Sequence, residues 1–262
     1  MNDLSYTAKV FKTVWVSDVH LGTKGSRAKE FLEFLKTIEC EKIFLVGDIV
    51  DGWQLSKRWY WPQTHNDVVQ KILEKAKRGT EIIFIPGNHD EVARDFIGLT
   101  MGGIKVKDDD IHYTADGKKF WVVHGDLFDN VIQHARWLAY IGDWAYVFLL
   151  KTNAVFNAIR RVFKLPYWSL SQYLKSKVKL AVSFMSAFEK SIATETRRRG
   201  CDGVICGHIH KAEMKMVEDI MYANDGDWVE SMTALVENFD GKLEIIECSK
   251  AKGKLTPVEG VK

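Results

Sequence analysis

The sequence lacks the features that mark secreted and membrane-spanning proteins. Residues 1–12 mix polar and charged side chains and have neither the basic start nor the apolar middle of a signal peptide. The most apolar segment, residues 137–150, is shorter than the roughly 18 to 20 apolar residues that a bilayer requires, and it contains Asp143. We therefore expect a cytoplasmic protein that crosses no membrane.

Paired cysteines and a large net charge are absent too. The four cysteines show none of the paired spacing of zinc sites or redox motifs, so we expect buried, reduced thiols at Cys40, Cys201, Cys206 and Cys248. The formal net charge of +2 is too small to predict a protein that binds polyanions. A basic surface must therefore come from local clustering of Lys and Arg.

Length and composition favour one domain. The 262 residues, 46% of them hydrophobic, can bury one sizeable core and are few for two independent domains. We expect a single domain over residues 1–262, interrupted by an inserted segment at 128–199. Residues 249–262 mix Lys, Gly and Pro without periodicity, which predicts a flexible tail.

The first part of the chain alternates between strand and helix patterns. β-Forming runs at 13–16, 43–46 and 82–85 are separated by apolar residues at helical spacing within 28–38 and 68–76. This alternation predicts βαβ units with a parallel sheet. Ligands of such sheets collect beyond the carboxyl ends of the strands.

The second part has shorter β-forming runs around a different kind of segment. Runs at 111–113, 120–123 and 203–206 are followed by three that are typical of an antiparallel arrangement, at 220–223, 232–236 and 243–246. Residues 128–199 have little strand signal, many aromatic residues and an excess of base over acid. We interpret them as a helical cap inserted into a split sheet.

Five polar motifs each follow a β-forming run. They are Asp18-Val19-His20, Gly47-Asp48, Gly87-Asn88-His89-Asp90, His124-Gly125-Asp126 and Gly207-His208-Ile209-His210. In an extended backbone, residues two apart point to the same side, so Asp18 lies with His20 and His208 with His210. Any one motif alone is compatible with an ordinary turn. Five of them at strand exits predict one shared site.

The side chains of these motifs suit divalent transition metals. Carboxylate oxygens combined with imidazole nitrogens favour manganese, iron or zinc over calcium. The candidate ligands are too many for one ion with open positions: Asp18, His20, Asp48, Asn88, His124, His208 and His210. Two ions about 3.5 to 4 Å apart that share a carboxylate fit this number, and such pairs bind phosphoryl groups and activate water.

In this order, the motifs resemble the motif series of the calcineurin-like metallophosphoesterases. The resemblance covers nearly all of the chain apart from the cap and the tail. It implies an α/β (α+β) fold of four layers, with two central mixed β-sheets flanked by helices. It also implies hydrolysis of phosphoesters or phosphoanhydrides.

The resemblance implies a role for each motif residue. It places a first metal on Asp18, His20 and His210 and a second on Asn88, His124 and His208, with Asp48 bridging them. His89 would contact the phosphate and protonate the leaving oxygen, and Asp90 would orient the His89 imidazole and keep it cationic. We expect manganese ions, with iron, zinc, cobalt and magnesium as alternatives.

Three features bear on the substrate. Gly52-Trp53 follows Asp51 where protein phosphatases of this family carry arginine, which disfavours a phosphoprotein. The cap after His124-Gly125-Asp126, and the segment 224–228, resemble the bacterial branch containing UDP-2,3-diacylglucosamine pyrophosphohydrolase of lipid A synthesis. That resemblance implies cleavage of a diacylated nucleotide sugar to UMP and 2,3-diacylglucosamine 1-phosphate. His89 departs from this branch, whose best-known members carry arginine there.

The cap supplies further candidates for substrate binding. Ser171, Lys175 and Lys179 are spaced to line one side of a helix, and we expect them to contact substrate together with Asn88, Asp126 and His208. The basic cap and the apolar residues 131–150 also predict peripheral contact with the anionic cytoplasmic face of the inner membrane.

Other interpretations remain open at this point. Arg197, Arg198 and Arg199 are compatible with a solvated helix end, where cations are favoured, or with a nuclease or phosphodiesterase whose cap binds nucleic acid. Trp53, Trp59 and Trp61 could stack on a base or sugar or pack against the cap. A non-catalytic scaffold is the third hypothesis, which the complete set of metal-ligand positions disfavours. The oligomeric state is not predicted.

Overall fold

The computed structural model describes residues 8–131, 170–248 and 255–258, and the chain divides into two compact units. Unit 1 comprises residues 1–126 and 193–262, and unit 2 comprises residues 127–192. The cap was predicted at 128–199. The division differs from that prediction at its end, because residues 193–199 belong to unit 1.

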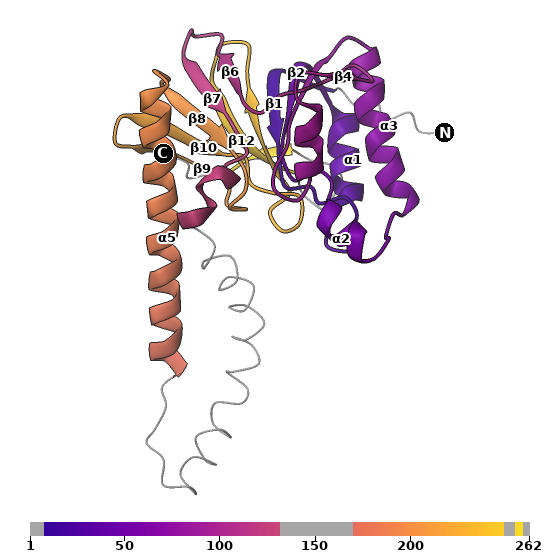
Figure 1. Ribbon diagram of the computed structural model, residues 1–262. Coiled ribbons are helices and arrows are strands. Elements are labelled where there is room, and N and C mark those ends of the chain that lie inside the picture. The colour runs from indigo at the N-terminus through magenta and orange to yellow at the C-terminus, as the bar shows by residue number, and fades with distance from the viewer. Residues whose placement is uncertain (1–7, 132–169, 249–254, 259–262) are drawn as a thin grey trace, which may run out of the picture. The chain divides into compact units, whose positions relative to one another are not determined.

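Within the described residues, the strands of unit 1 form a sheet of eight and a sheet of five (Figure 1). The spatial order of the larger sheet is β13 (Leu255–Pro257), β12 (Leu243–Cys248), β11 (Thr233–Glu237), β1 (Lys9–Val16), β2 (Ile38–Val46), β3 (Glu81–Ile85), β5 (Ile104–Val106) and β4 (Thr100–Met101). The smaller sheet has the order β6 (Asp110–Tyr113), β7 (Lys119–Val122), β8 (Gly203–Cys206), β10 (Ile220–Asn224) and β9 (Glu213–Val217).

Both sheets are mixed, which confirms the predicted fold class. In the larger sheet β1, β2, β3 and β5 are parallel, while β11 runs antiparallel to β1. In the smaller sheet β7, β8 and β10 are parallel, and β6 and β9 are antiparallel edges. The parallel strands place their carboxyl ends together, which is where the polar motifs begin.

Two amphipathic helices cover one face of the larger sheet. Helices α1 (Ala28–Thr37) and α3 (Gln63–Lys77) lie side by side there (Figure 1). Their apolar faces bury Phe31 and Leu35 of α1 and Val68 and Ile72 of α3 in a core that includes Val14 of β1. The helical periodicity of the sequence predicted both helices, because each buries only one face.

A second core fills the space between the two sheets. It contains Trp15 and Phe44 from the larger sheet and Phe120 and Ile205 from the smaller one. A buried polar link joins the sheets as well, since His112 Nε2 of β6 lies 2.8 Å from Glu237 Oε2 of β11. Burial alone would raise the pKa of Glu237, but the hydrogen bond from His112 lowers it. The carboxylate is therefore ionised and satisfied in the core.

Two sequence predictions about strands were wrong in part. Residues 220–223 were expected in one antiparallel run with the two strands that follow, but β10 joins the smaller sheet, parallel to β8. The apolar pattern of a strand does not reveal which sheet it joins. Residues 255–257, predicted within a flexible tail, pair antiparallel with β12 because Leu255 is buried.

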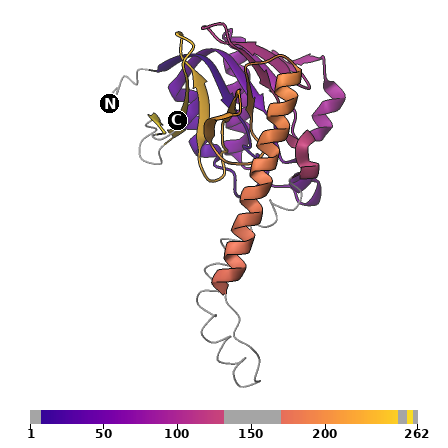
Figure 2. The same ribbon diagram turned by 90° about the vertical axis from the view of Figure 1, so that its left-hand side faces the viewer.

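Shorter helices follow several strands. They are α2 (Gly52–Lys57), the 3₁₀ turn η1 (Glu91–Phe96) and the 3₁₀ turn η2 (Asp126–Val131). The long helix α5 (Leu170–Arg198) runs without interruption in both views (Figures 1 and 2). In unit 2 the rings of Phe128 and Phe188 meet edge to face with centroids 6.1 Å apart.

Several predictions for the cap fall outside the described part of the chain. Residues 137–150 lie outside the described residues. Helix α5 includes Ser171, Lys175 and Lys179, but the side chains of these three residues are not described. Among the helices that the structure does describe, none is long and apolar enough to cross a membrane.

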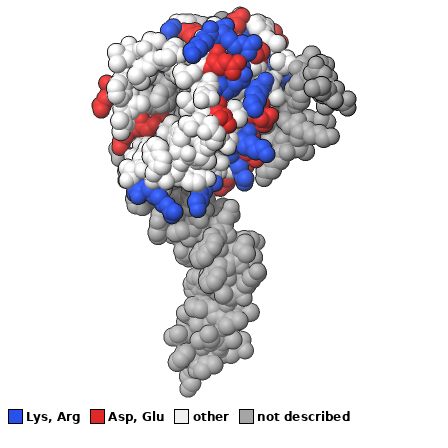
Figure 3. Space-filling model, turned by 90° about the vertical axis from the view of Figure 1, so that its right-hand side faces the viewer, with Lys and Arg blue, Asp and Glu red and all other residues white. Residues whose placement is uncertain are grey.

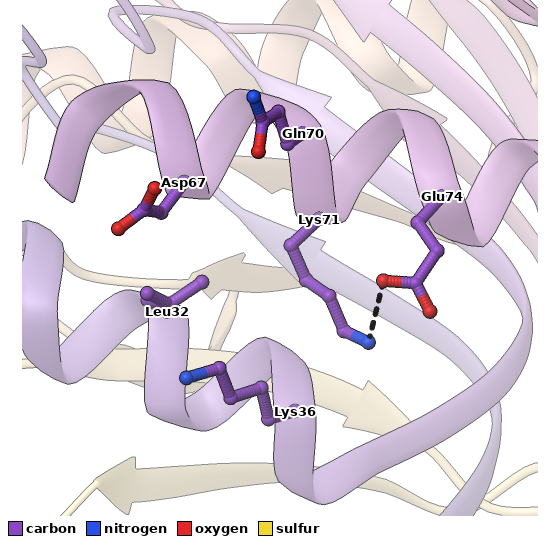
Figure 4. A pocket seen from close by; sticks show the side chains of 6 residues that line it. All are labelled: Leu32, Lys36, Asp67, Gln70, Lys71 and Glu74. Atoms are coloured by element: carbon purple, nitrogen blue, oxygen red, sulfur yellow. Dashed lines mark hydrogen bonds and ion pairs between the residues drawn. The ribbon is translucent and has the colours of Figure 1, made fainter. Parts of the chain in front are cut away.

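An open pocket of about 290 Å³ lies between α1 and α3, the helices that follow the first two motif loops. It is lined by Leu32, Lys36, Asp67, Gln70, Lys71 and Glu74 (Figure 4). Its charges offset one another, since Lys71 Nζ lies 3.1 Å from a Glu74 carboxylate oxygen. Basic and acidic side chains are also intermixed on the side of unit 1 that carries α3 (Figure 3). This surface therefore has no field of one sign to select a charged ligand.

Candidate metal centre

Backbone strain is concentrated in the motif residues. Seven described residues other than glycine have positive φ, and five of them are predicted metal ligands: Asp18, His20, Asp48, His208 and His210, with φ between 50° and 70°. Such conformations cost of order 1–3 kcal/mol each and persist only where the surroundings hold them. The backbone at the strand ends is therefore strained, and this strained conformation sets the direction of the ligand side chains.

Backbone hydrogen bonds hold the loops after β1 and β2 side by side. The N–H of Asp18 donates to Gly47 O at 3.0 Å, and the N–H of His20 donates to Asp48 O at 2.9 Å. The loop after β7 reaches across from the smaller sheet, because His124 Nδ1 lies 2.7 Å from Val46 O. A proton on Nδ1 makes that contact and leaves Nε2 as the atom that can bind a metal.

The first group of ligands surrounds one oxygen of Asp18. Asp18 Oδ1 lies 3.0 Å from His210 Nε2 and 3.7 Å from His20 Nε2. The other oxygen, Oδ2, accepts the backbone N–H of His208 at 2.8 Å. Asp18, His20 and His210 thus present three donor atoms within 4.8 Å of one another.

The second group is arranged around Asp48. Asp48 Oδ2 lies 3.5 Å from His124 Nε2 and 4.0 Å from His20 Nε2, so it faces both groups of ligands. Its Oδ1 accepts the N–H of His89 at 2.8 Å. Asp48, His124 and His208 form a second fully buried set with converging donor atoms.

The donor atoms fit divalent ions. Asn88 Oδ1 is buried and makes no hydrogen bond within the described chain. The buried Asp18 Oδ1 and His124 Nε2 face other ligands, at 3.0 Å from His210 Nε2 and 3.5 Å from Asp48 Oδ2. A buried polar atom left without a hydrogen bond costs about 1–3 kcal/mol, so such atoms need another partner. Carboxylate, amide and imidazole donors together match the requirements of manganese, iron or zinc.

Electrostatics at the site favour charged carboxylates beside cationic groups. Burial alone would raise the pKa of Asp18, but the imidazoles of His210 and His20 hold it well below its usual range. Burial alone would lower the pKa of His20 and His124, but the neighbouring carboxylates raise them to about 9 and about 10. The carboxylates therefore attract positive charge to this place, which protons or metal ions can supply.

The predicted pairing of His89 with Asp90 is corrected by the structure. The carboxylate near the His89 ring is Asp51, whose Oδ2 lies 3.1 Å from His89 Nδ1 and 3.3 Å from His20 Nδ1. The Asp90 carboxylate instead accepts the backbone N–H groups of Gly87 at 2.6 Å and Ile49 at 2.8 Å. Adjacent residues need not face each other, and here the backbone of two motif loops takes up the Asp90 oxygens.

One contact of His89 was left open by the sequence. Among the tryptophans of residues 53–61, only Trp53 has a described contact with the His89 ring, with centroids 4.5 Å apart and planes at 38°. Trp53 is 44% exposed and also donates from Nε1 to Glu91 Oε1. An exposed indole beside His89 offers an apolar surface to a bound molecule.

The remaining candidates have structural partners. Asp126 Oδ2 accepts a hydrogen bond from Arg94 Nη2 at 2.5 Å, and its role in substrate binding stays a prediction. Within the described residues the arginine triplet is paired with acids: Arg197 with Glu218 and Asp219, Arg198 with Glu195, and Arg199 with Glu195 and Asp109. These cations are neutralised locally, which does not favour a nucleic-acid surface.

Comparison with known proteins agrees with this geometry. The model of the calcineurin-like phosphoesterase family matches residues 11–212, well over half of the chain. The chain belongs to this family. Members use divalent metals, and this metallophosphoesterase is accordingly a metal-dependent hydrolase.

Its curated relatives share a printed name. UDP-2,3-diacylglucosamine hydrolase from Blochmanniella pennsylvanica is 26% identical over 76% of this chain and 78% of its own length. The protein of the same name from Edwardsiella ictaluri is 23% identical over 76% of both chains.

Solved structures of low sequence identity also resemble this chain. A Vps29 mutant from Entamoeba histolytica is 16% identical, with a TM-score of 0.46 over 94% of this chain and 96% of that chain. The phosphoesterase Yfce from E. coli is 14% identical, with a TM-score of 0.46 over 94% of this chain and 97% of that chain.

The assignment of Asp51 leads to a first prediction. Asp51→Asn should lower kcat by about 10- to 100-fold with a smaller change in KM, because the His89 imidazole loses its anionic partner. Steady-state kinetics with a phosphodiester or pyrophosphate substrate, together with metal content, measure this. Asp67→Asn, a half-buried exchange on α3 outside the metal centre, is the matched control. A lower kcat for Asp90→Asn at unchanged stability and metal content, with Asp51→Asn active, would restore the pairing of His89 with Asp90.

Proposed function

We propose that this metallophosphoesterase hydrolyses the pyrophosphate bond of UDP-2,3-diacylglucosamine, releasing UMP and 2,3-diacylglucosamine 1-phosphate. The observation that carries the proposed phosphoanhydride hydrolysis is the position of Asp48 Oδ2, which faces both groups of metal ligands. The family match and the printed names of the relatives support the substrate. The product would then serve lipid A synthesis.

The metal centre would hold two ions, and we propose manganese. Asp18, His20 and His210 would hold one, and Asn88, His124 and His208 the other, with Asp48 between them. When bound, these ions would supply Lewis-acid stabilisation of phosphoryl charge and activation of water.

The residues around the centre would orient the substrate and move a proton. His89 Nε2 lies 3.9 Å from Asp48 Oδ2, so the imidazole borders the centre while Asp51 holds its Nδ1 side. A cationic His89 can contact the phosphate and donate its proton to the leaving oxygen. The exposed face of Trp53 lies beside this imidazole and can stack on the base or sugar.

Further contacts are proposed from the sequence. Asn88, Asp126 and His208 would contact the phosphates or sugar, and Ser171, Lys175 and Lys179 of the cap would bind the substrate from α5. The basic cap would make peripheral contact with the cytoplasmic face of the inner membrane, where a diacylated substrate resides.

A second candidate function is hydrolysis of another phosphodiester. It is favoured by His89, which stands where the best-known members of the lipid A branch carry arginine. A nuclease is the weaker form of this alternative, because the described arginines at 197–199 are paired with acids.

A substrate screen tests the proposal. Purified protein with manganese should convert UDP-2,3-diacylglucosamine to UMP and the lipid monophosphate at least about 100-fold faster than it cleaves UDP-glucose or an aryl phosphodiester, because acyl chains add binding energy. The His89→Ala variant should lose about 100-fold or more in kcat. Rapid hydrolysis of the aryl phosphodiester without turnover of the lipid substrate would establish the second candidate instead.

A further inference from the structure

A buried serine lies between two carboxylates behind the first group of metal ligands. Ser17 Oγ is 2.7 Å from Asp18 Oδ2 and 2.6 Å from Asp225 Oδ1. Both aspartates are fully buried, and Ser17 is 1% exposed. Gly226 O, at 3.2 Å, is a further and more distant acceptor near the same hydroxyl. Asp225 belongs to segment 224–228, which the proposed metal chemistry does not use.

The number of protons constrains the state of these groups. A serine hydroxyl has one proton, so it can donate to only one of the two carboxylates. The other contact is equally short, and two oxygens at 2.6 or 2.7 Å need a proton between them. One of the two aspartates must therefore bring its own proton to the cluster.

Asp18 is the ionised member of the pair. Its Oδ2 accepts the N–H of His208 at 2.8 Å, and its Oδ1 lies 3.0 Å from His210 Nε2. The His208 N–H and the His210 ring thus stabilise a negative charge on Asp18. The extra proton is left to Asp225.

The surroundings of Asp225 favour a neutral acid. Its Oδ2 is buried and makes no hydrogen bond within the described residues, which would be costly for an anion. The loop is fixed in place, because Asn224 Nδ2 donates to Gly207 O at 2.6 Å and the N–H of Trp228 donates to Asp18 O at 3.0 Å.

We infer that Asp225 is a neutral carboxylic acid that donates to Ser17, and that Ser17 donates to Asp18. This relay holds Asp18 Oδ2 so that Oδ1 faces His20 and His210. Asp225 is therefore a positioning residue that acts on a metal ligand through Ser17. The inference rests on the proposed metal centre and is independent of which phosphoester is the substrate.

Two substitutions at position 225 test whether a hydrogen-bond donor is needed there. Asparagine can donate a hydrogen bond to Ser17, and leucine has a similar size but cannot. Asp225→Asn keeps a donor toward Ser17 and should bind Mn²⁺ within about threefold of the unmodified protein. Asp225→Leu and Ser17→Ala remove the relay and should weaken Mn²⁺ binding about 10- to 100-fold, as for other groups that orient metal ligands. Titration of metal-free protein with Mn²⁺, followed by calorimetry, measures this without substrate, and thermal unfolding monitors folding.

The control is a second aspartate of the same loop. Asp227 accepts the backbone N–H groups of Val229 and Glu230, so Asp227→Asn should lower the unfolding temperature and leave Mn²⁺ affinity unchanged. Affinity for Asp225→Asn as weak as for Ser17→Ala would overturn the inference, because Asp225 would then act as an acceptor. If Asp225→Leu does not fold, the Mn²⁺ affinities of Asp225→Asn and Ser17→Ala still test the inference. Failure of the proposed substrate would appear only in the substrate screen.

Discussion

Asp48→Ala is expected to lower kcat/KM by at least about 1000-fold, a loss of roughly 4 kcal/mol of transition-state stabilisation. Asp48 Oδ2 faces His124 Nε2 at 3.5 Å and His20 Nε2 at 4.0 Å, so one carboxylate serves both groups of ligands. Its removal leaves those imidazoles without their shared anion, and metal content should fall below two ions per chain. Kinetics and elemental analysis of the same preparation measure both effects.

The matched control is an aspartate outside the centre. Asp95 is exposed on η1, so Asp95→Ala removes the same carboxylate group from the surface and should leave kinetics and metal content unchanged. An Asp48→Ala protein that retains two ions and more than about a tenth of the activity would contradict the bridging role.

Gly87→Ala should lower activity by at least about 100-fold. A Cβ atom at this position would lie 2.3 Å from Asp48 Oδ1 and 2.6 Å from His124 Nε2. Contacts this short require those side chains or the loop to move, and misplacement of catalytic groups by about 1 Å costs roughly 100-fold in rate. Measurement of kcat/KM, metal content and unfolding temperature distinguishes a displaced centre from an unfolded chain.

A second glycine provides the control for this exchange. A Cβ at Gly25 would meet Val229 Cγ1 at 3.5 Å, an ordinary contact, and Gly25 is exposed. Gly25→Ala should therefore keep full activity. If Gly87→Ala also kept full activity and both metals, the close packing of Gly87 against Asp48 and His124 would not matter for function.

The sequence predicted the general fold and the composition of the site because both depend on local patterns. The β-forming runs before Asp18, Asp48 and Asn88 end at the carboxyl edge of parallel strands, as the alternation with helices indicated. The two-residue spacing correctly placed His20 with Asp18, but the same reasoning was wrong for His208 and His210, which fall into different ligand groups. The assumed extended backbone does not hold there, because both histidines have positive φ.

Features that depend on contacts between distant segments were not predictable. The partner of His89 is Asp51 rather than its neighbour Asp90, because the oxygens of Asp90 are taken up by backbone N–H groups. Arg197 lies opposite Asp219, and neither charge alone reveals that pairing. The role of Asp225 required the position of Ser17, which is 208 residues earlier in the chain.

The most direct test of a two-metal centre is anomalous diffraction from crystals grown with Mn²⁺. Two anomalous peaks are expected, one among Asp18, His20 and His210 and one among Asn88, His124 and His208, at a separation of about 3.5 to 4 Å. Asp48 should lie between them. A single peak at full occupancy, or two peaks without Asp48 between them, would contradict the assignment.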